Sequence, residues 1–159
     1  MPTPRDPSLS RRGPDEGPDR TPEGGPYDWW QRGTELLERG DPGAAAVLLE
    51  HAVQAEAASS ATWEALGRAR YDAGNFRGAV EAFGRLVDLS PGSHYGHFAL
   101  GLSLTRVDRF EQGAEHLAMA ATMRPDRPEY ADRLRQARAT LRARREAREG
   151  PESRENRGA

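Results

Sequence analysis

The chain has 159 residues, of which 36% are hydrophobic, and a formal net charge of −2. It contains no cysteine, which excludes disulfide bonds and thiolate metal ligands. It also lacks the long apolar run of a membrane span and the apolar core of a secretion signal, so we expect a cytoplasmic protein.

Residues 1–26 hold seven of the twelve prolines and almost no large apolar side chain. Such a segment buries too little surface to offset the entropy lost on ordering, so we predict a disordered tail. We interpret it as a solubilising tail. The alternative is a docking or regulatory segment that contains Ser8, Ser10 and Thr21.

Helical spacing of apolar residues then predicts seven helices, near 28–39, 42–57, 60–73, 76–89, 94–107, 110–123 and 127–148. Gly74 stands where a first helix must reverse, and Asn75 and Asp41 are N-cap residues for the helices that follow. In the third unit Asp108 takes the glycine's place and must tolerate the left-handed backbone. We expect Asp126 to cap the last helix, and we expect that helix to project beyond Arg142 with no face to pack.

A period of 34 residues organises the chain. Small residues, aromatics and prolines return at this step, and these landmarks are Trp29, Gly33, Gly40, Ala45, Trp63, Leu66, Gly67, Gly74, Phe76, Ala79, Phe83, Pro91, Leu100, Gly101, Phe110, Gly113 and Pro125. Small residues such as Gly67 and Ala79 allow the two helices of a unit to approach closely, and we expect Trp29 and Trp63 to belong to the core.

A 34-residue step with the pattern W-x-x-L-G, then a small residue, an aromatic and a proline, resembles the tetratricopeptide repeat. The resemblance implies an all-α fold, a right-handed α-solenoid of three helix-turn-helix repeats within residues 27–127, with units near 26–59, 60–93 and 94–127. A capping helix at 128–149 and a disordered tail at 150–159 follow. The chain is similar to small cytoplasmic tetratricopeptide proteins of actinobacteria.

In that family the first helix of each pair lines a concave groove that binds partners. By this resemblance the groove residues are Tyr27, Trp30, Thr34, Glu64, Arg68, Tyr71, Asp72, Tyr95, Phe98, Leu102 and Arg106. Exposed aromatic side chains on such a face anchor a peptide or a helix. The alternative is that Tyr27 and Tyr95 only cover the ends of neighbouring helices.

The groove of this family that grips the terminal carboxylate of heat-shock chaperones uses lysine, asparagine and arginine at set positions. Trp30, Thr34, Tyr95 and Ala99 stand at four of those positions here. The resemblance therefore does not extend to chaperone-tail binding, and it favours an aromatic groove for a helix or an extended segment.

The remaining ionisable residues give weaker signals. His94 and His97 lie one helical turn apart, but no further ligand completes a metal set, so we expect His97 to have a packing role and we predict no metal or other cofactor. His51 and His116 are expected at the surface or between helices. From Arg133 to the C-terminus there are nine arginines and four glutamates, a pattern that attracts phosphates or acidic proteins.

We find no phosphate loop and no nucleophile with a base at useful spacing, so we expect a protein without enzymatic activity. The favoured hypothesis is an interaction scaffold that binds a segment of a partner protein in the groove. One alternative is a self-associating homodimer, and another is a nucleic-acid- or ribosome-associated factor that uses the arginine-rich end. The sequence names neither the partner nor the process.

Overall fold

The computed structural model describes residues 21–55, 57–150 and 158. These residues form seven α-helices and no strand: α1 Pro26–Glu38, α2 Pro42–Val53, α3 Ser60–Asp72, α4 Phe76–Leu89, α5 His94–Arg106, α6 Phe110–Met123 and α7 Pro128–Glu149. Most of the two predicted tails, at 1–26 and 150–159, lies outside the described residues. Residues 21–25 are described, and there the Trp29 indole N–H donates to the carbonyl oxygens of Pro22 and Glu23, both at 3.2 Å.

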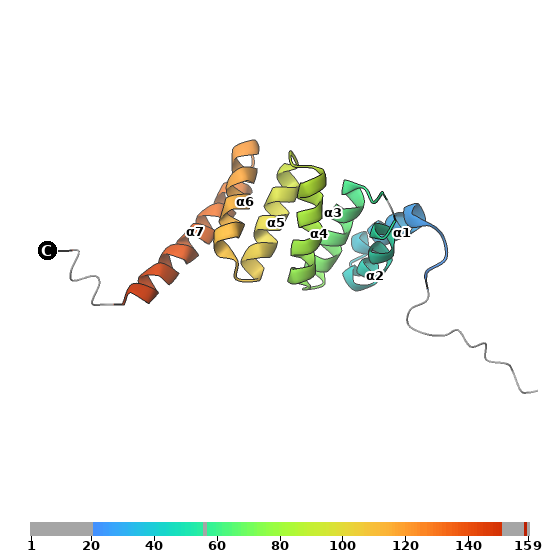
Figure 1. Cartoon of the computed structure of the whole chain (residues 1–159), viewed down its shortest axis with the longest axis horizontal. Helices are drawn as coiled ribbons and strands as arrows, with labels where there is room; N and C mark the ends of the chain where they lie inside the picture. The colour runs from blue at the N-terminus through green and yellow to red at the C-terminus, as the bar shows by residue number, and fades with distance from the viewer. Residues whose placement is uncertain (1–20, 56, 151–157, 159) are drawn as a thin grey trace, which may run out of the picture.

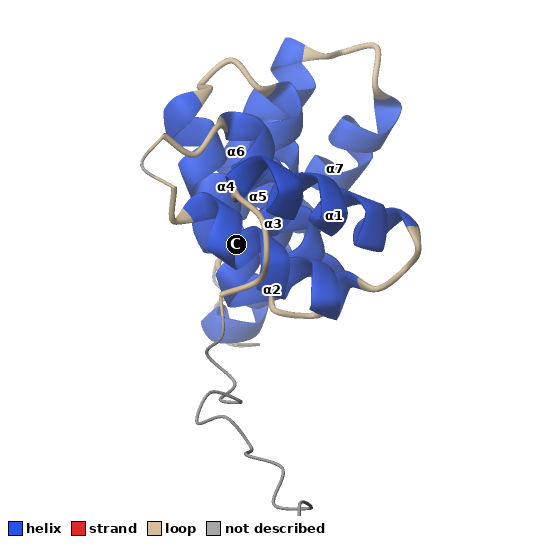
Figure 2. Ribbon diagram, turned by 90° about the vertical axis from the view of Figure 1, so that its right-hand side faces the viewer, coloured by secondary structure: helices blue, strands red, loops and turns tan. Residues whose placement is uncertain are grey.

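The helices form a solenoid in which each helix packs on the next one in the chain (Figure 1). The first helices of successive pairs also touch, α1 with α3 and α5 with α7. Seen from the end, the helices are stacked in pairs behind one another, with short connections between them (Figure 2). No helix within the described part of the chain is long and apolar enough to cross a membrane.

In each helix pair, one glycine of the first helix lies against a large side chain of the second helix. A Cβ added to Gly67 would lie 2.6 Å from Cε1 of Phe83, well inside van der Waals contact. The same clash recurs 34 residues away on each side, at 2.6 Å from Gly33 to Leu49 and at 2.7 Å from Gly101 to Leu117. Glycine is therefore required for the first helix of each pair to sit against the large side chain of the second. The expected close approach at Gly67 is confirmed, and its partner is Phe83.

The three predicted reversals within the repeats all use the left-handed backbone. Gly40 and Gly74 have φ of 79° and 81°, and Asp108 has φ of 65°. Asp108 is the one non-glycine residue with positive φ in the described part of the chain. Its carboxylate accepts a hydrogen bond from Arg144 of α7 at 2.9 Å, so the strained position also anchors the last helix.

Two of the predicted caps are confirmed and one is wrong. The side chains of Asp41 and Asn75 accept from the backbone N–H groups three residues on. Asp126 does not cap α7, which begins after Arg127 without a side-chain cap. Arg124 instead holds the Asp126 carboxylate through two hydrogen bonds of 2.8 and 2.7 Å. This pairing lowers the pKa of Asp126 to about 2.

Most helix boundaries agree with the prediction to within two residues, but α2 ends at Val53 instead of 57. Alanine favours helix wherever it occurs, so the alanine-rich sequence gives no stop signal there. The chain must nevertheless turn before α3. It does so with short-range backbone bonds, from Gln54 N–H to His51 O and from Ala55 N–H to Ala52 O.

The core consists of three clusters along the solenoid. Trp63 packs against both the first and the second of them, although it is itself only half-buried. Trp29 belongs to none of the three and is also half-buried, so its predicted place in the core is wrong. No repeat precedes α1 within the described residues, and the Trp29 indole is contacted there by the carbonyl groups of residues 22 and 23 and by the His51 ring, with ring centres 5.8 Å apart.

The packing of α7 on the preceding repeat continues beyond Arg142, further along the helix than the sequence indicates. The Arg144 guanidinium lies over the Phe110 ring, 4.5 Å from its centre, and pairs with Asp108. The prediction of no packing face beyond Arg142 is therefore wrong. Arginine has a long apolar stem and a flat charged end, which cover an aromatic ring well.

Candidate functional site

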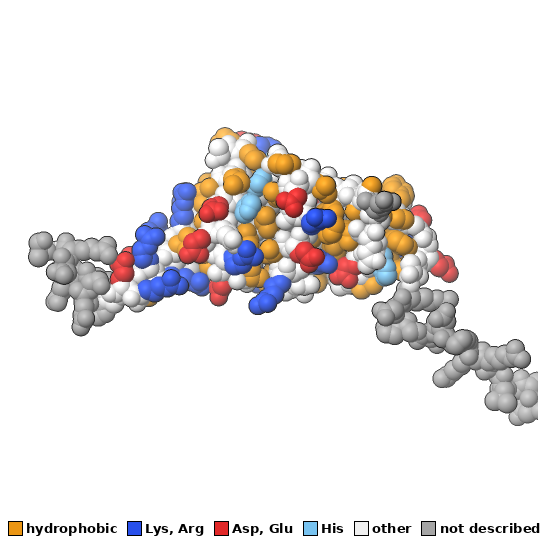
Figure 3. Space-filling model, in the orientation of Figure 1, with side chains coloured by type: hydrophobic (Ala, Val, Ile, Leu, Met, Phe, Trp, Pro, Cys, Tyr) orange, Lys and Arg blue, Asp and Glu red, His pale blue; other side chains and the backbone are white. Residues whose placement is uncertain are grey.

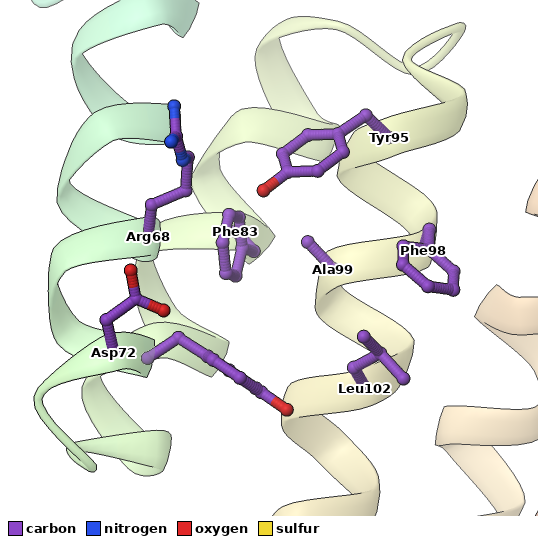
Figure 4. Close-up of a pocket in the computed structure, with 8 residues that line it drawn as sticks. Arg68, Asp72, Phe83, Tyr95, Phe98, Ala99 and Leu102 are labelled. Atoms are coloured by element: carbon purple, nitrogen blue, oxygen red, sulfur yellow. The ribbon is translucent and has the colours of Figure 1, made fainter. Parts of the chain in front are cut away.

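A pocket of about 290 Å³ opens between α3 and α5 (Figure 4). Its lining combines four aromatic rings with two charged side chains, and consists of Arg68, Tyr71, Asp72, Phe83, Tyr95, Phe98, Ala99 and Leu102. Six of these are residues that the sequence assigned to the groove. The pocket exists because α3 and α5 are the first helices of successive repeats, and α4 supplies the Phe83 floor between them.

Contacts behind the pocket fix its aromatic walls. Phe98 stacks on Tyr130 of α7 with ring centres 4.3 Å apart. Tyr71 meets the edge of Phe76 at 5.1 Å, and Phe83 meets Tyr95 at 6.3 Å in a similar edge-on arrangement. These rings are therefore positioned before any partner arrives, which lowers the entropy lost on binding.

The polar groups of the pocket have no partners of their own within the described residues. Neither Arg68 nor Asp72 has an ion pair there, and the Tyr95 hydroxyl has no hydrogen bond. The Tyr95 hydroxyl points into the space beside Arg68 (Figure 4). Burial raises the pKa of Tyr95 to about 12, with Arg68 opposing and Glu64 and Asp72 adding to the rise. At neutral pH this hydroxyl is a neutral donor facing the pocket.

Two of the predicted groove residues lie elsewhere. Tyr27 and Trp30 line a second, more apolar pocket of about 320 Å³ with the alanines of the α2–α3 connection. Tyr27 is 70% exposed. The Trp30 indole nitrogen is buried without a hydrogen-bond partner in the described structure. The sequence therefore predicted one continuous set of aromatics, and the structure divides it into two pockets.

The other predicted groove residues line neither pocket. Thr34 is occupied by a hydrogen bond to the Gln31 carbonyl at 2.8 Å. Arg106 lies over the Phe76 ring at 4.1 Å, and Glu64 is half-buried on α3. Conversely, Phe83 and Ala99 line the main pocket, although the sequence marked Phe83 only as a repeat landmark and did not assign Ala99 to the groove.

The histidines are used in packing, as expected for His97. Its Nε2 is 2.8 Å from the Pro91 carbonyl oxygen, which can only accept, so Nδ1 of His97 accepts from Nδ1–H of His116 at 3.0 Å. His94 lies apart and bonds the Tyr130 hydroxyl at 2.9 Å. Burial and then the neighbouring His97 lower the pKa of His116. No group of three metal-binding side chains occurs in the part of the chain that is described.

The comparisons with known proteins agree with this architecture. Residues 36–100 match the family model described as a tetratricopeptide repeat. The same glycine contact and turn continue on both sides of that segment, in the first and third helix pairs. Residues 36–100 therefore contain tetratricopeptide repeats, and the helix pairs on both sides continue the same fold. No curated protein sequence matches it.

Solved structures with the same fold have low sequence identity to the chain. A crystal structure of MamA is 17% identical with a TM-score of 0.69, and the match covers 73% of this chain and 68% of MamA. The first tetratricopeptide domain of Spaghetti (RPAP3), bound to an HSP90 peptide, is 14% identical with a TM-score of 0.68, covering 73% and 92%. The O-GlcNAc transferase of Thermobaculum terrenum is 26% identical with a TM-score of 0.61, covering 70% of this chain and 22% of the enzyme.

A double mutant of MamA RS-1 matches with a TM-score of 0.70 and 18% identity, and this chain spans 65% of its length. These likenesses establish the fold.

Proposed function

We propose that the protein is a non-enzymatic scaffold that binds a segment of a partner protein in the pocket between α3 and α5. The single observation that carries this proposal is a pocket with fixed aromatic walls whose polar groups have no partner in the described structure. The RPAP3 domain supports the proposal, since a domain of the same fold is bound to a peptide in its solved structure.

The size of the pocket supports a side chain as the occupant. About 290 Å³ lies at the lower limit of small-molecule sites, which span about 300–1,000 Å³. Phe83, Ala99 and Leu102 provide an apolar floor for a large apolar side chain. Arg68 and the Tyr95 hydroxyl are donors for backbone carbonyls of the segment, and Asp72 accepts from its N–H groups or pairs with a basic side chain.

The test is a capture experiment with three full-length baits. One is the native chain, and one carries Arg68→Ala and Tyr71→Ala in the pocket. The third is a matched control with Arg77→Ala and Val47→Ala, both exposed and outside that pocket. Circular dichroism checks that all three are equally helical. We expect at least one protein to be held by the native and control baits and lost from the pocket bait. If all three baits hold the same proteins, the pocket is not the binding site.

A further inference from the structure

The two ends of the solenoid carry opposite charges. Residues 26–54, which form α1 and α2, contain two arginines and five acids, whereas residues 128–149, which form α7, contain seven arginines and four acids. Figure 3 shows basic side chains along the α7 end of the molecule and acidic ones at the opposite end. The repeat register shows which of these charges face outward along the solenoid.

On α1, charged and polar residues are exposed at positions where the later repeats have buried residues. The position of Asp28 is buried in the following units as Thr62, Gly96 and Tyr130, and that of Glu35 as Ala69, Ser103 and Ala137. Those later residues face the preceding helix pair. No helix pair precedes α1 within the described residues, and Asp28, Gln31, Arg32 and Glu35 are exposed on this terminal face. Asp28 accepts a hydrogen bond from the Gly25 N–H, while the Glu35 carboxylate has no partner in the described structure.

At the α7 end the same register places arginines on the open face. Arg135 stands at the position of Gly33, Gly67 and Gly101, where a first helix receives its own second helix. Arg138 and Arg142 continue this face one and two turns further on. Arg138, Arg142 and Arg145 are exposed and make no ion pair or hydrogen bond with the described residues. No second helix follows within the described residues, so this face of α7 is unpartnered.

We propose that the arginine face of α7, defined by Arg135, Arg138, Arg142 and Arg145, docks on the acidic terminal face of α1 in a second copy of the chain. The occupant follows from charge: each face lies at one end of the described stack of helices. The α1 face carries two carboxylates and one arginine, and the α7 face carries four arginines, of which Arg135 also pairs with Asp132. The contact joins different surfaces, so it is heterologous and extends into open chains instead of closing as a dimer. It uses neither side of the pocket between α3 and α5, and so leaves that pocket accessible.

The contact depends on exposed charges and is therefore salt-sensitive. Pairs of solvent-exposed charges are individually weak, and they are screened beyond about 10 Å at 0.1 M salt and about 3 Å at 1 M. We expect association at low ionic strength that reverses as salt is added. Because each copy offers both faces, species larger than a dimer form at high protein concentration.

Sedimentation velocity of the full chain over a wide range of concentration, at about 50 mM and about 500 mM salt, tests the proposal. We expect the weight-average sedimentation coefficient to rise with concentration only at low salt. Arg138→Glu with Arg142→Glu should weaken association at least ~10-fold, and so should Gln31→Arg with Glu35→Arg at the other end. A mixture of these two double variants should associate again, since each restores the opposite charge that the other has lost.

The matched control is Arg77→Glu with Arg109→Glu, the same charge change on exposed residues at the starts of α4 and α6. It should associate like the native chain. Three results overturn the proposal: a monomer at every concentration at low salt, equal loss of association in the control, or no recovery in the mixture. Binding of added polyuridylate by a native chain that does not self-associate would assign the arginine face to nucleic acid and also overturn it.

Discussion

Replacing a single glycine with alanine should have opposite effects at two sites of this solenoid. In the interior of a helix, alanine is favoured over glycine by about 1 kcal/mol. At Gly84 of α4 the new Cβ meets nothing within 4 Å, so the free energy of unfolding should rise by about 0.5–1 kcal/mol. At Gly67 the same methyl group lies 2.6, 2.7 and 2.8 Å from three atoms of the Phe83 ring.

Phe83 is 1% exposed and packs in the central cluster, so displacing its ring disturbs that packing. Overpacking of this kind costs about 1–3 kcal/mol, so Gly67→Ala should be less stable than Gly84→Ala by about that amount. Urea unfolding followed by circular dichroism measures both variants, and thermal unfolding should separate them by several degrees. If Gly67→Ala proved as stable as Gly84→Ala, the contact that we describe as holding each helix pair would not exist.

Three further changes test other parts of the structure. Asp108→Ala should be less stable than Asp108→Gly by about 1 kcal/mol in urea unfolding, since both lose Arg144 but only alanine keeps the backbone strain; equal stability would contradict the strain. Truncating Trp63 to alanine should lower the unfolding free energy by about 3 kcal/mol, because the ring bridges two clusters; a loss below about 1 kcal/mol would refute that role. Because the folded state lowers the pKa of His116, the unfolded chain binds the proton first as pH falls below about 6.5, and stability should decrease there. His116→Gln should lose less stability than the native chain between about pH 7.5 and 5.5, and an unchanged pH profile would exclude this residue as the cause.

The 34-residue period predicted most of the fold because each repeat faces the same physical demands. A glycine that must receive a large side chain in one unit must do so in the next, and Gly33, Gly67 and Gly101 all do. The same reasoning predicted the reversals at Gly74 and Asp108. Local rules of backbone conformation and packing are sufficient at these positions, since the residues involved lie within one unit.

The prediction was wrong where two interactions compete for one side chain. Asp126 has the chemistry of a cap, but the Arg124 guanidinium binds both carboxylate oxygens and removes it from that role. Arg144 has the chemistry of a solvated residue, but Phe110 and Asp108 lie within its reach. Neither outcome follows from spacing, because each depends on the geometry of neighbours.

Of the predicted groove residues, only residues on α3 and α5 line the candidate pocket, and those on α1 do not. Residues of α3 and α5 meet in one pocket because the two helices occupy equivalent positions in adjacent repeats. Tyr27 and Trp30 instead line a second pocket together with alanines of the connection between α2 and α3. No residue in that connection marks such a pocket in the sequence. The stacking of Phe98 on Tyr130 is also a tertiary contact between a repeat and the helix that follows it.

The most direct test of the proposed function is a photo-crosslinking experiment in the source cell. One full-length variant carries a photoreactive amino acid in place of Arg68, at the exposed edge of the pocket, and another carries it in place of Arg77 on α4. We predict that a partner protein becomes covalently attached at position 68 and not at position 77. Attachment at position 77 alone, or equally at both positions, would show that partners bind outside the pocket and would contradict the proposed function.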